Sequence, residues 1–98
     1  MEYCCYILYS KKIERYYIGY TSDLEERLYL HQSGFFGGKS YTHKTDDWEL
    51  FLQIPCTSII QAVNIERRIK GMKSQNYIQN LKKYPEIVEK LVNESSIS

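Results

Sequence analysis

Two side chains that are charged or can become charged lie on a face of a predicted helix that would otherwise be apolar. Leu24, Arg27, Leu28 and His31 follow an i, i+3, i+4, i+7 spacing, which places all four on one arc of the helix. A buried arginine without a partner costs several kcal/mol, so Arg27 must meet an anion or line a cleft. His31 is either a hydrogen-bonded core histidine or a catalytic group.

A carboxylate occupies a comparable position in a second predicted helix. Glu66 shares an arc with four apolar residues, Ile59, Ala62, Val63 and Ile69. A carboxylate in such surroundings either pairs with a cation or binds a metal ion. An internal ion pair between Arg27 and Glu66 would satisfy both residues, and this alternative stays open.

Two tyrosines lie in a predicted N-terminal hairpin. Residues 3–9 and 16–20 are rich in β-branched, aromatic and aliphatic side chains, and a polar run separates them, which is typical of two antiparallel strands. A symmetric connection of even length would place Tyr6 directly opposite Tyr17, with Cβ atoms about 5 Å apart. The two tyrosines are either ordinary strand formers or a functional pair.

The first helix and the segment after it have clear boundaries in the sequence. Ser22 is the predicted N-cap, and Glu25 completes a capping box. The helix should run to about residue 32 and end at Ser33-Gly34, where glycine can take the left-handed conformation. Residues 35–47 contain Gly, Ser, Thr and Asp without a clean period, which predicts a loop.

The second half of the chain predicts one strand and three helices. Alternation over residues 48–54 indicates a third strand that ends at Pro55. A helix capped by Thr57 or Ser58 should follow and reach about Gly71, and two more helices are predicted over residues 74–83 and 85–92. The order β-β-α-β-α-α-α predicts an α/β fold of the α+β type, in which helices cover a small, mainly antiparallel sheet.

Length and composition indicate one globular domain over residues 1–93, with a frayed tail over residues 94–98. The apolar fraction of 43% excludes disorder. No stretch approaches the ~20 apolar residues of a membrane span, and the N-terminus does not resemble a signal peptide, so we expect a cytoplasmic protein. The three cysteines show no CxxC or Cys/His ligand spacing, which argues against zinc and a disulfide framework.

The net charge of +1 indicates no partner, but the basic residues are unevenly distributed. Six of them occur over residues 62–83 against Glu66 alone: Arg67, Arg68, Lys70, Lys73, Lys82 and Lys83. Such a patch suits a modest phosphate-binding footprint. A solvated helix face is the alternative.

Several segments resemble the GIY-YIG nuclease family, in particular its small single-domain branch, which is similar to the nuclease module of the bacterial excinuclease C subunit. They are CCYILYS at residues 4–10, YIG at 17–19, TSDLEERLYLH at 21–31 and AVNIERRIKGMKS at 62–74. The ten residues from Ile7 to Tyr16 separate the tyrosine of the first motif, Tyr6, from that of the second, Tyr17. The resemblance covers residues 3 to about 83. One departure is that the first motif has Cys4-Cys5-Tyr6, which retains only its tyrosine.

The resemblance implies a three-stranded antiparallel sheet flanked by helices and hydrolysis of DNA phosphodiester bonds in repair or recombination. One divalent ion, Mg²⁺ or Mn²⁺, would serve as cofactor. Matching the motifs implies that Tyr6 activates the attacking water and that Tyr17 orients water or phosphate. Arg27 would bind the scissile phosphate, His31 would be an auxiliary polar group, and Glu66 would be the sole protein ligand of the metal.

The chemistry of phosphodiester hydrolysis suits these residue types. The transition state gathers negative charge that a guanidinium and a metal ion can neutralise, and Mg²⁺ accepts a single carboxylate together with waters and substrate oxygens. Tyr6, with an ordinary pKa near 10, can act as a base only with help from metal-bound hydroxide or positive charge. Lys70 and Lys73 either contact flanking phosphates or are solvated. The resemblance further implies that Gly19 is structural and lets the backbone approach a helix closely.

Two other functions stay open. The chain could be a nucleic-acid-binding module that keeps the fold without cutting, although the set Tyr6, Tyr17, Arg27 and Glu66 argues for cleavage. It could also be a small protein-interaction domain. The sequence offers neither a base-reading helix nor a recognition motif, which leaves room for a protein partner that supplies target specificity, and it leaves the oligomeric state open.

Overall fold

A computed structural model of the chain describes residues 3–33, 45 and 47–95. Most of the loop predicted over residues 35–47 lies outside the described residues. The elements occur in the predicted order, β-β-α-β-α-α-α. None of the described helices is long and apolar enough to cross a membrane.

A three-stranded antiparallel sheet forms the centre of the molecule. β1 (Tyr3–Ser10) pairs with both β2 (Arg15–Thr21) and β3 (Glu49–Cys56), so the strand order is β2-β1-β3. Four residues connect β1 to β2, and the last of them, Glu14, has a left-handed backbone with φ of 51°. The predicted antiparallel sheet is therefore confirmed, with β2 and β3 as its edges.

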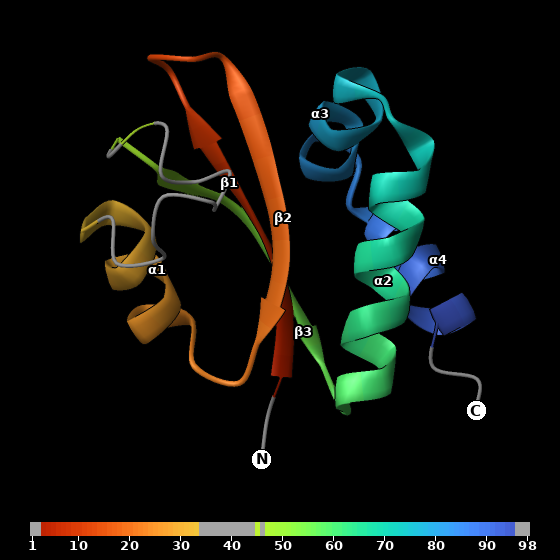
Figure 1. Cartoon of the computed structure of the whole chain (residues 1–98). Coiled ribbons are helices and arrows are strands. Elements are labelled where there is room, and N and C mark those ends of the chain that lie inside the picture. Colours follow the sequence, from red (N-terminus) through yellow and green to blue (C-terminus); the bar gives the residue numbers. More distant parts are fainter. Residues whose placement is uncertain (1–2, 34–44, 46, 96–98) are drawn as a thin grey trace.

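Helices cover the two faces of the sheet unequally (Figure 1). α1 (Leu24–Ser33) lies on one face. α2 (Ile59–Met72), α3 (Gln75–Lys83) and α4 (Pro85–Ser95) lie on the other, with α2 against the strands. Because successive side chains of a strand point to opposite faces, β1 contributes to two separate cores.

The larger core lies between the sheet and α2, and it contains Cys5 and Ile7 of β1 together with Ile65 and Ile69 of α2. The smaller core lies between the sheet and α1. It consists of Tyr6, Leu8 and Trp48, with partly buried apolar side chains such as Leu24 and Leu28 packed against it. Tyr6 is thus a core residue on the side of the sheet that α1 covers.

β3 differs from its predicted form in two ways. It continues through Pro55 to Cys56, because an edge strand tolerates a residue without a backbone N–H. A bulge also interrupts the register, since Ile7 pairs with Leu52 whereas Leu8 pairs with Leu50. The predicted alternation is therefore broken, and Trp48 and Ile54 belong to different cores.

Short polar residues set the helix starts, with one correction. The backbone N–H of Glu26 donates to Asp23 Oδ1 over 3.1 Å, so Asp23 caps α1 in place of the predicted Ser22. Thr21 Oγ1 accepts from the backbone N–H of Asp23 over 3.0 Å, which orders the turn before the cap. Ser58, one of the two predicted caps, caps α2. Ser74, predicted as the first residue of the third helix, is the N-cap of α3.

The C-terminal helix extends beyond its predicted end at residue 92. α4 continues through Glu94 and Ser95, so these two residues of the predicted tail are helical. Arg68 Nη1 lies 2.7 Å from Glu94 Oε2, and Ser95 is buried. α4 is therefore attached to α2 along its last turn.

Candidate active site

Three aromatic rings gather between the sheet and α1. Tyr6 Oη of β1 lies 2.9 Å from His31 Nε2 of α1, and both side chains are at most 2% exposed. The ring of Tyr17 lies 4.8 Å from that of His31 and 6.3 Å from that of Tyr6, measured between centroids. The predicted tyrosine pair and the predicted helix residue His31 are thus brought together.

The register of the hairpin differs from the predicted one by two residues. Tyr6 pairs with Gly19, and Tyr17 pairs with Leu8, so the two tyrosines are diagonal neighbours and do not lie directly opposite each other. The four-residue turn after Ser10 sets this register. Because the shift is an even number, both rings still point to the face that α1 covers.

Gly19 provides the space in which the phenol of Tyr6 lies. A Cβ atom at this position would be 2.7 Å from Tyr6 Oη, 2.8 Å from Tyr6 Cζ and 3.1 Å from Tyr17 Cε1. Such distances are shorter than van der Waals contact, so any larger residue would displace the phenol. The predicted close approach at Gly19 is therefore to the Tyr6 side chain and not to a helix.

Burial keeps the hydrogen-bonded pair neutral. It raises the pKa of Tyr6 well above the ordinary value near 10, with Tyr17 adding to the rise and the charge of Arg27 opposing it. Burial, with a smaller contribution from Arg27, lowers the pKa of His31 to about 4. At neutral pH the phenol is protonated and the imidazole is uncharged, so His31 Nε2 can accept the phenolic proton.

Arg27 lies at the exposed edge of this cluster. It is on α1, one turn before His31, and its side chain is exposed to solvent. Its positive charge acts on both Tyr6 and His31, as the pKa shifts of those residues indicate. An anion that binds Arg27 from solvent would therefore lie close to the hydrogen-bonded pair.

Glu66 is not part of this cluster. It belongs to α2, which covers the opposite face of the sheet, and its Oε1 lies 3.2 Å from Lys70 Nζ one turn further on. The buried stripe of α2 runs through Ala62, Ile65 and Ile69, so Glu66 flanks the stripe and has a side chain that is 15% exposed. The expectation that all five residues share one face is therefore wrong for Glu66.

The alternative of an Arg27–Glu66 ion pair also fails, because the sheet separates the two helices. The phase of α2 explains a second difference, that Glu66 lies beside the buried stripe of α2 and not in its middle. Ile59, which the sequence places on the buried arc, is 46% exposed at the first turn, and Ile65 takes the central position. Only the packing of α2 against the sheet selects between these two arcs.

The donor atoms present suit a metal ion that takes most of its ligands from elsewhere. No group of three His, Cys, Asp or Glu side chains that could hold an ion occurs among the described residues. Glu66 offers one hard carboxylate with partial access to solvent. This fits Mg²⁺ or Mn²⁺ bound by one carboxylate, waters and substrate oxygens, and an ion there would compete with Lys70.

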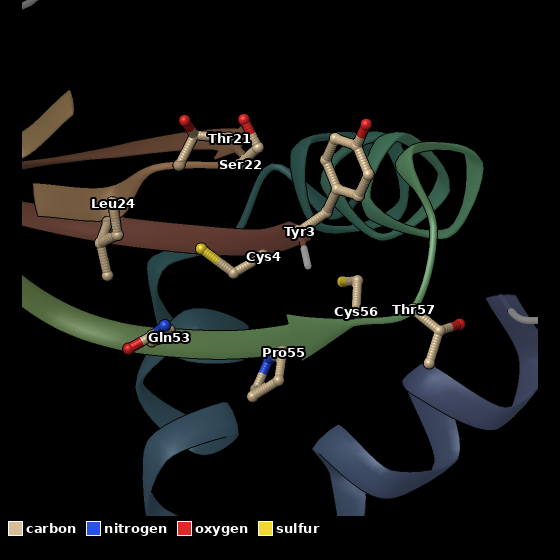
Figure 2. A pocket seen from close by; sticks show the side chains of 9 residues that line it. All are labelled: Tyr3, Cys4, Thr21, Ser22, Leu24, Gln53, Pro55, Cys56 and Thr57. Carbon is tan, nitrogen blue, oxygen red and sulfur yellow. The ribbon is translucent and has the colours of Figure 1, made fainter. Parts of the chain in front are cut away.

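A pocket adjoins the site where β1 begins (Figure 2). It has a volume of about 360 Å³, and Cys4, Leu24 and Gln53 point into it from three different elements. Gln53 is the cross-strand partner of Tyr6, and Leu24 packs in the same core as Tyr6. No charged side chain lines this pocket among the described residues, so it suits neutral groups and leaves the binding of an anion to the exposed Arg27.

Sequence patterns did not indicate two residues that border the site. The ring of Trp48 lies 6.3 Å from that of Tyr17 and is fully buried. Asp47, just before it, accepts hydrogen bonds from Ser10 Oγ, the backbone N–H of Lys12 and Thr45 Oγ1, and the pKa of Asp47 is lowered to about 2 as a result. Asp47 thus ties the β1–β2 turn to the segment before β3, a long-range contact without a local sequence signal.

Residues 2–84 match the family model described as the GIY-YIG catalytic domain. This span runs from β1 through α3 and contains every residue of the candidate site, whereas α4 lies beyond it. No curated protein and no solved structure matches the chain.

Proposed function

Since the chain belongs to the GIY-YIG catalytic domain family, a nuclease-type domain, we propose that it is an endonuclease that hydrolyses DNA phosphodiester bonds and depends on a divalent metal ion. The observation that carries this proposal is the buried Tyr6–His31 hydrogen bond, with Tyr17 and the charge of Arg27 beside it. Apolar side chains could fill this core without the cost of removing a hydroxyl and an imidazole from water, so packing alone does not explain Tyr6 and His31 here.

Tyr6 and His31 would act together on the attacking water. Because burial raises the pKa of Tyr6 and keeps the phenol protonated, Tyr6 is not a phenolate at neutral pH before the reaction. It can accept a proton from water only while it passes its own proton to His31 Nε2, 2.9 Å away. The proton of the water thus reaches the phenolic oxygen, and the former phenolic proton forms the imidazolium.

The substrate would make this transfer favourable. The charge of Arg27 is one cause of the low pKa of His31. A phosphate bound to the exposed guanidinium would offset that charge, which raises the basicity of the imidazole when the substrate is present. Arg27 would also neutralise the charge that develops on the phosphate oxygens, and the ring of Tyr17 would orient the phosphate against Tyr6.

A divalent ion, when bound by Glu66, would supply Lewis-acid neutralisation of the phosphate. α2, which carries Glu66, packs against β2, and β2 is the edge strand that carries Tyr17. DNA that reaches over this edge would contact groups from both faces. To bind the ion, the carboxylate of Glu66 would first have to break its ion pair with Lys70.

Cleavage of labelled DNA tests the proposal directly. Duplex, single-stranded, flapped and branched substrates, the last two of which arise in repair and recombination, are incubated with Mg²⁺, Mn²⁺ or EDTA. We expect cleavage only with a metal ion. Glu66→Gln should lower the rate by at least about a hundredfold, as loss of a group that positions an essential metal does. The matched control, Glu89→Gln on the exposed face of α4, should cut normally.

The position of Glu66 on the opposite face favours a second candidate, a DNA-binding module that does not cut. Binding of DNA without cleavage of any substrate in Mg²⁺ or Mn²⁺ would support that candidate over the nuclease. Equal cleavage by the Glu66→Gln variant and the unmodified chain would retain the nuclease and remove Glu66 as the metal ligand.

A further inference from the structure

A second pocket lies on the side of the sheet that α2 and α3 cover. It has a volume of about 240 Å³ and is bounded by the start of β2, the end of α2 and the start of α3. Its apolar wall includes Ile18, Ile69 and Ile78. We call it the β2–α3 groove.

Three cations from separate segments line the β2–α3 groove. Arg15 begins β2, Lys70 lies in the last turn of α2, and Lys73 follows the end of that helix. No acidic side chain is among its described lining residues. The groove therefore concentrates positive charge on a chain whose net charge is only +1.

Two further pockets bordered by described residues differ from the groove in charge. The pocket at the start of β1 has no charged lining (Figure 2). The pocket between α2 and α4 has two basic side chains that are balanced by two acidic ones: Arg68, Lys90, Glu86 and Glu94. Of these three pockets, the β2–α3 groove alone has a positive lining, which does not follow from the general composition.

The backbone at Lys73 supports a role for its side chain. Lys73 has a left-handed backbone with φ of 49°, and its N–H donates to the carbonyl of Lys70 over 3.2 Å. Glycine is the residue that this position favours, because a side chain is strained there. A lysine at this point keeps a charge beside the groove at a cost in stability.

The position of the groove connects it with the candidate active site. Tyr16 lines the groove, and Tyr17, the next residue of β2, belongs to the cluster under α1. One edge strand therefore separates the two sites. Lys70 lines the groove and also pairs with Glu66, so the groove borders the proposed metal ligand.

We propose that the β2–α3 groove binds a phosphate of the DNA backbone, with Arg15, Lys70 and Lys73 as its cationic contacts. This inference rests on the proposed nuclease function and extends it. The substrate strand would cross the edge of the sheet at β2, with Arg27 as its contact on one face and these three cations on the other. Ser74 and Gln75 at the start of α3 add polar groups to the same wall.

DNA binding by a variant without two of the charges tests the groove. A fluorescent duplex in EDTA is titrated at several salt concentrations with the full chain, with Arg15→Gln/Lys73→Gly and with a charge-matched control. The control is Lys11→Ala/Lys90→Ala, whose two lysines are exposed and do not line the groove. Glycine suits the backbone of residue 73, so the first variant should fold, and its melting curve checks this. We expect binding about tenfold weaker than that of the control, and a salt dependence whose slope is smaller by about 0.9 for each phosphate that the variant no longer neutralises.

Inorganic phosphate provides a readout that does not depend on cleavage. In amide NMR spectra of the full chain, phosphate should shift residues 15–16 and 70–75 in a saturable way, and Arg15→Gln/Lys73→Gly should abolish these shifts. Shifts confined to other residues, or equal weakening of DNA binding in the control variant, would overturn the groove as a phosphate site. A chain that binds phosphate here but cuts no DNA would retain the groove and refute the nuclease.

Discussion

At the scale of single residues, the proposed chemistry depends on a buried pair that carries no net charge before the substrate binds. Tyr6 and His31 are hydrogen-bonded, and burial shifts their pKa values in opposite directions, so each side chain stays neutral at pH 7. A neutral pair is less costly to bury than an ion pair. In the proposed mechanism this pair would transfer a proton once a bound substrate supplies compensating charge.

Replacement of Tyr6 by phenylalanine removes the hydroxyl and keeps the ring. We expect the cleavage rate to fall by about 10²- to 10⁴-fold, the usual contribution of a general base. Stability should fall by about 1 to 3 kcal/mol, because His31 Nε2 loses its partner. Tyr9→Phe, in the aromatic pair with Tyr16, is the matched control and should cut normally. A Tyr6→Phe chain that is folded and fully active would rule out proton transfer through this hydroxyl.

The low pKa of His31 predicts how stability depends on pH. The imidazole has a pKa of about 4 in the folded chain and 6.5 when unfolded. Between these pH values the unfolded state binds more protons than the folded state. The contribution of His31 to the free energy of unfolding is therefore fully present above pH 6.5, and roughly 2 to 3 kcal/mol of it is lost as the pH falls towards 4. Urea unfolding at several pH values measures this. The His31→Gln variant should lack this part of the pH dependence. If the free energy of unfolding changed with pH equally in the variant and the unmodified chain, the pH dependence could not come from His31.

At the scale of elements, the hairpin register and one glycine determine whether the phenol reaches its partner. The four-residue turn pairs Tyr6 with Gly19, and the absence of a side chain at Gly19 leaves room for the phenol. A register shifted by two residues would place Tyr6 opposite Tyr17 and no longer opposite Gly19, so the phenol would lose the space that this glycine leaves.

Two glycines of the chain form a matched pair for testing this. Gly19→Ala should destabilise the fold by about 1 to 3 kcal/mol and impair cleavage, because the new Cβ would overlap the Tyr6 ring. Gly71→Ala in the exposed last turn of α2 meets no atom within 4 Å and should be neutral or stabilising by up to about 1 kcal/mol. Thermal unfolding and cleavage assays measure both. An unperturbed Gly19→Ala chain would show that Tyr6 has another place to lie.

At the scale of the whole molecule, the sheet divides the proposed machinery into two halves. Tyr6, Tyr17, His31 and Arg27 lie on the side that α1 covers, whereas Glu66 belongs to the helices of the other face. The two halves pack in different cores, so they contribute separately to stability. Only a substrate that contacts both would couple them.

A double-mutant cycle of Tyr6→Phe and Glu66→Gln measures this division. Their effects on the free energy of unfolding should add within about 0.5 kcal/mol, because the side chains share no partner. Their effects on cleavage should not add, since both would act on the same transition state. Additive effects on cleavage would indicate that the two residues serve different steps.

Local patterns in the amino-acid sequence were enough to predict the elements, their order and the candidate residues. Strand alternation, helix spacing and the cap Ser58 are local properties, since each depends on side chains a few residues apart. Tyr6, Tyr17 and His31 were identified in the same way, because strand and helix periodicities predict which side chains share a face.

How these residues meet depends on the folded chain as a whole. The hairpin register, the bulge at Phe51 and the phase of α2 are set by contacts between segments far apart in sequence, such as Asp47 with Ser10 and α2 with the sheet. Such choices differ by small packing energies that no local pattern contains. For this reason the sequence identified Glu66 as a buried carboxylate, while the fold determined that it lies across the sheet from Tyr6.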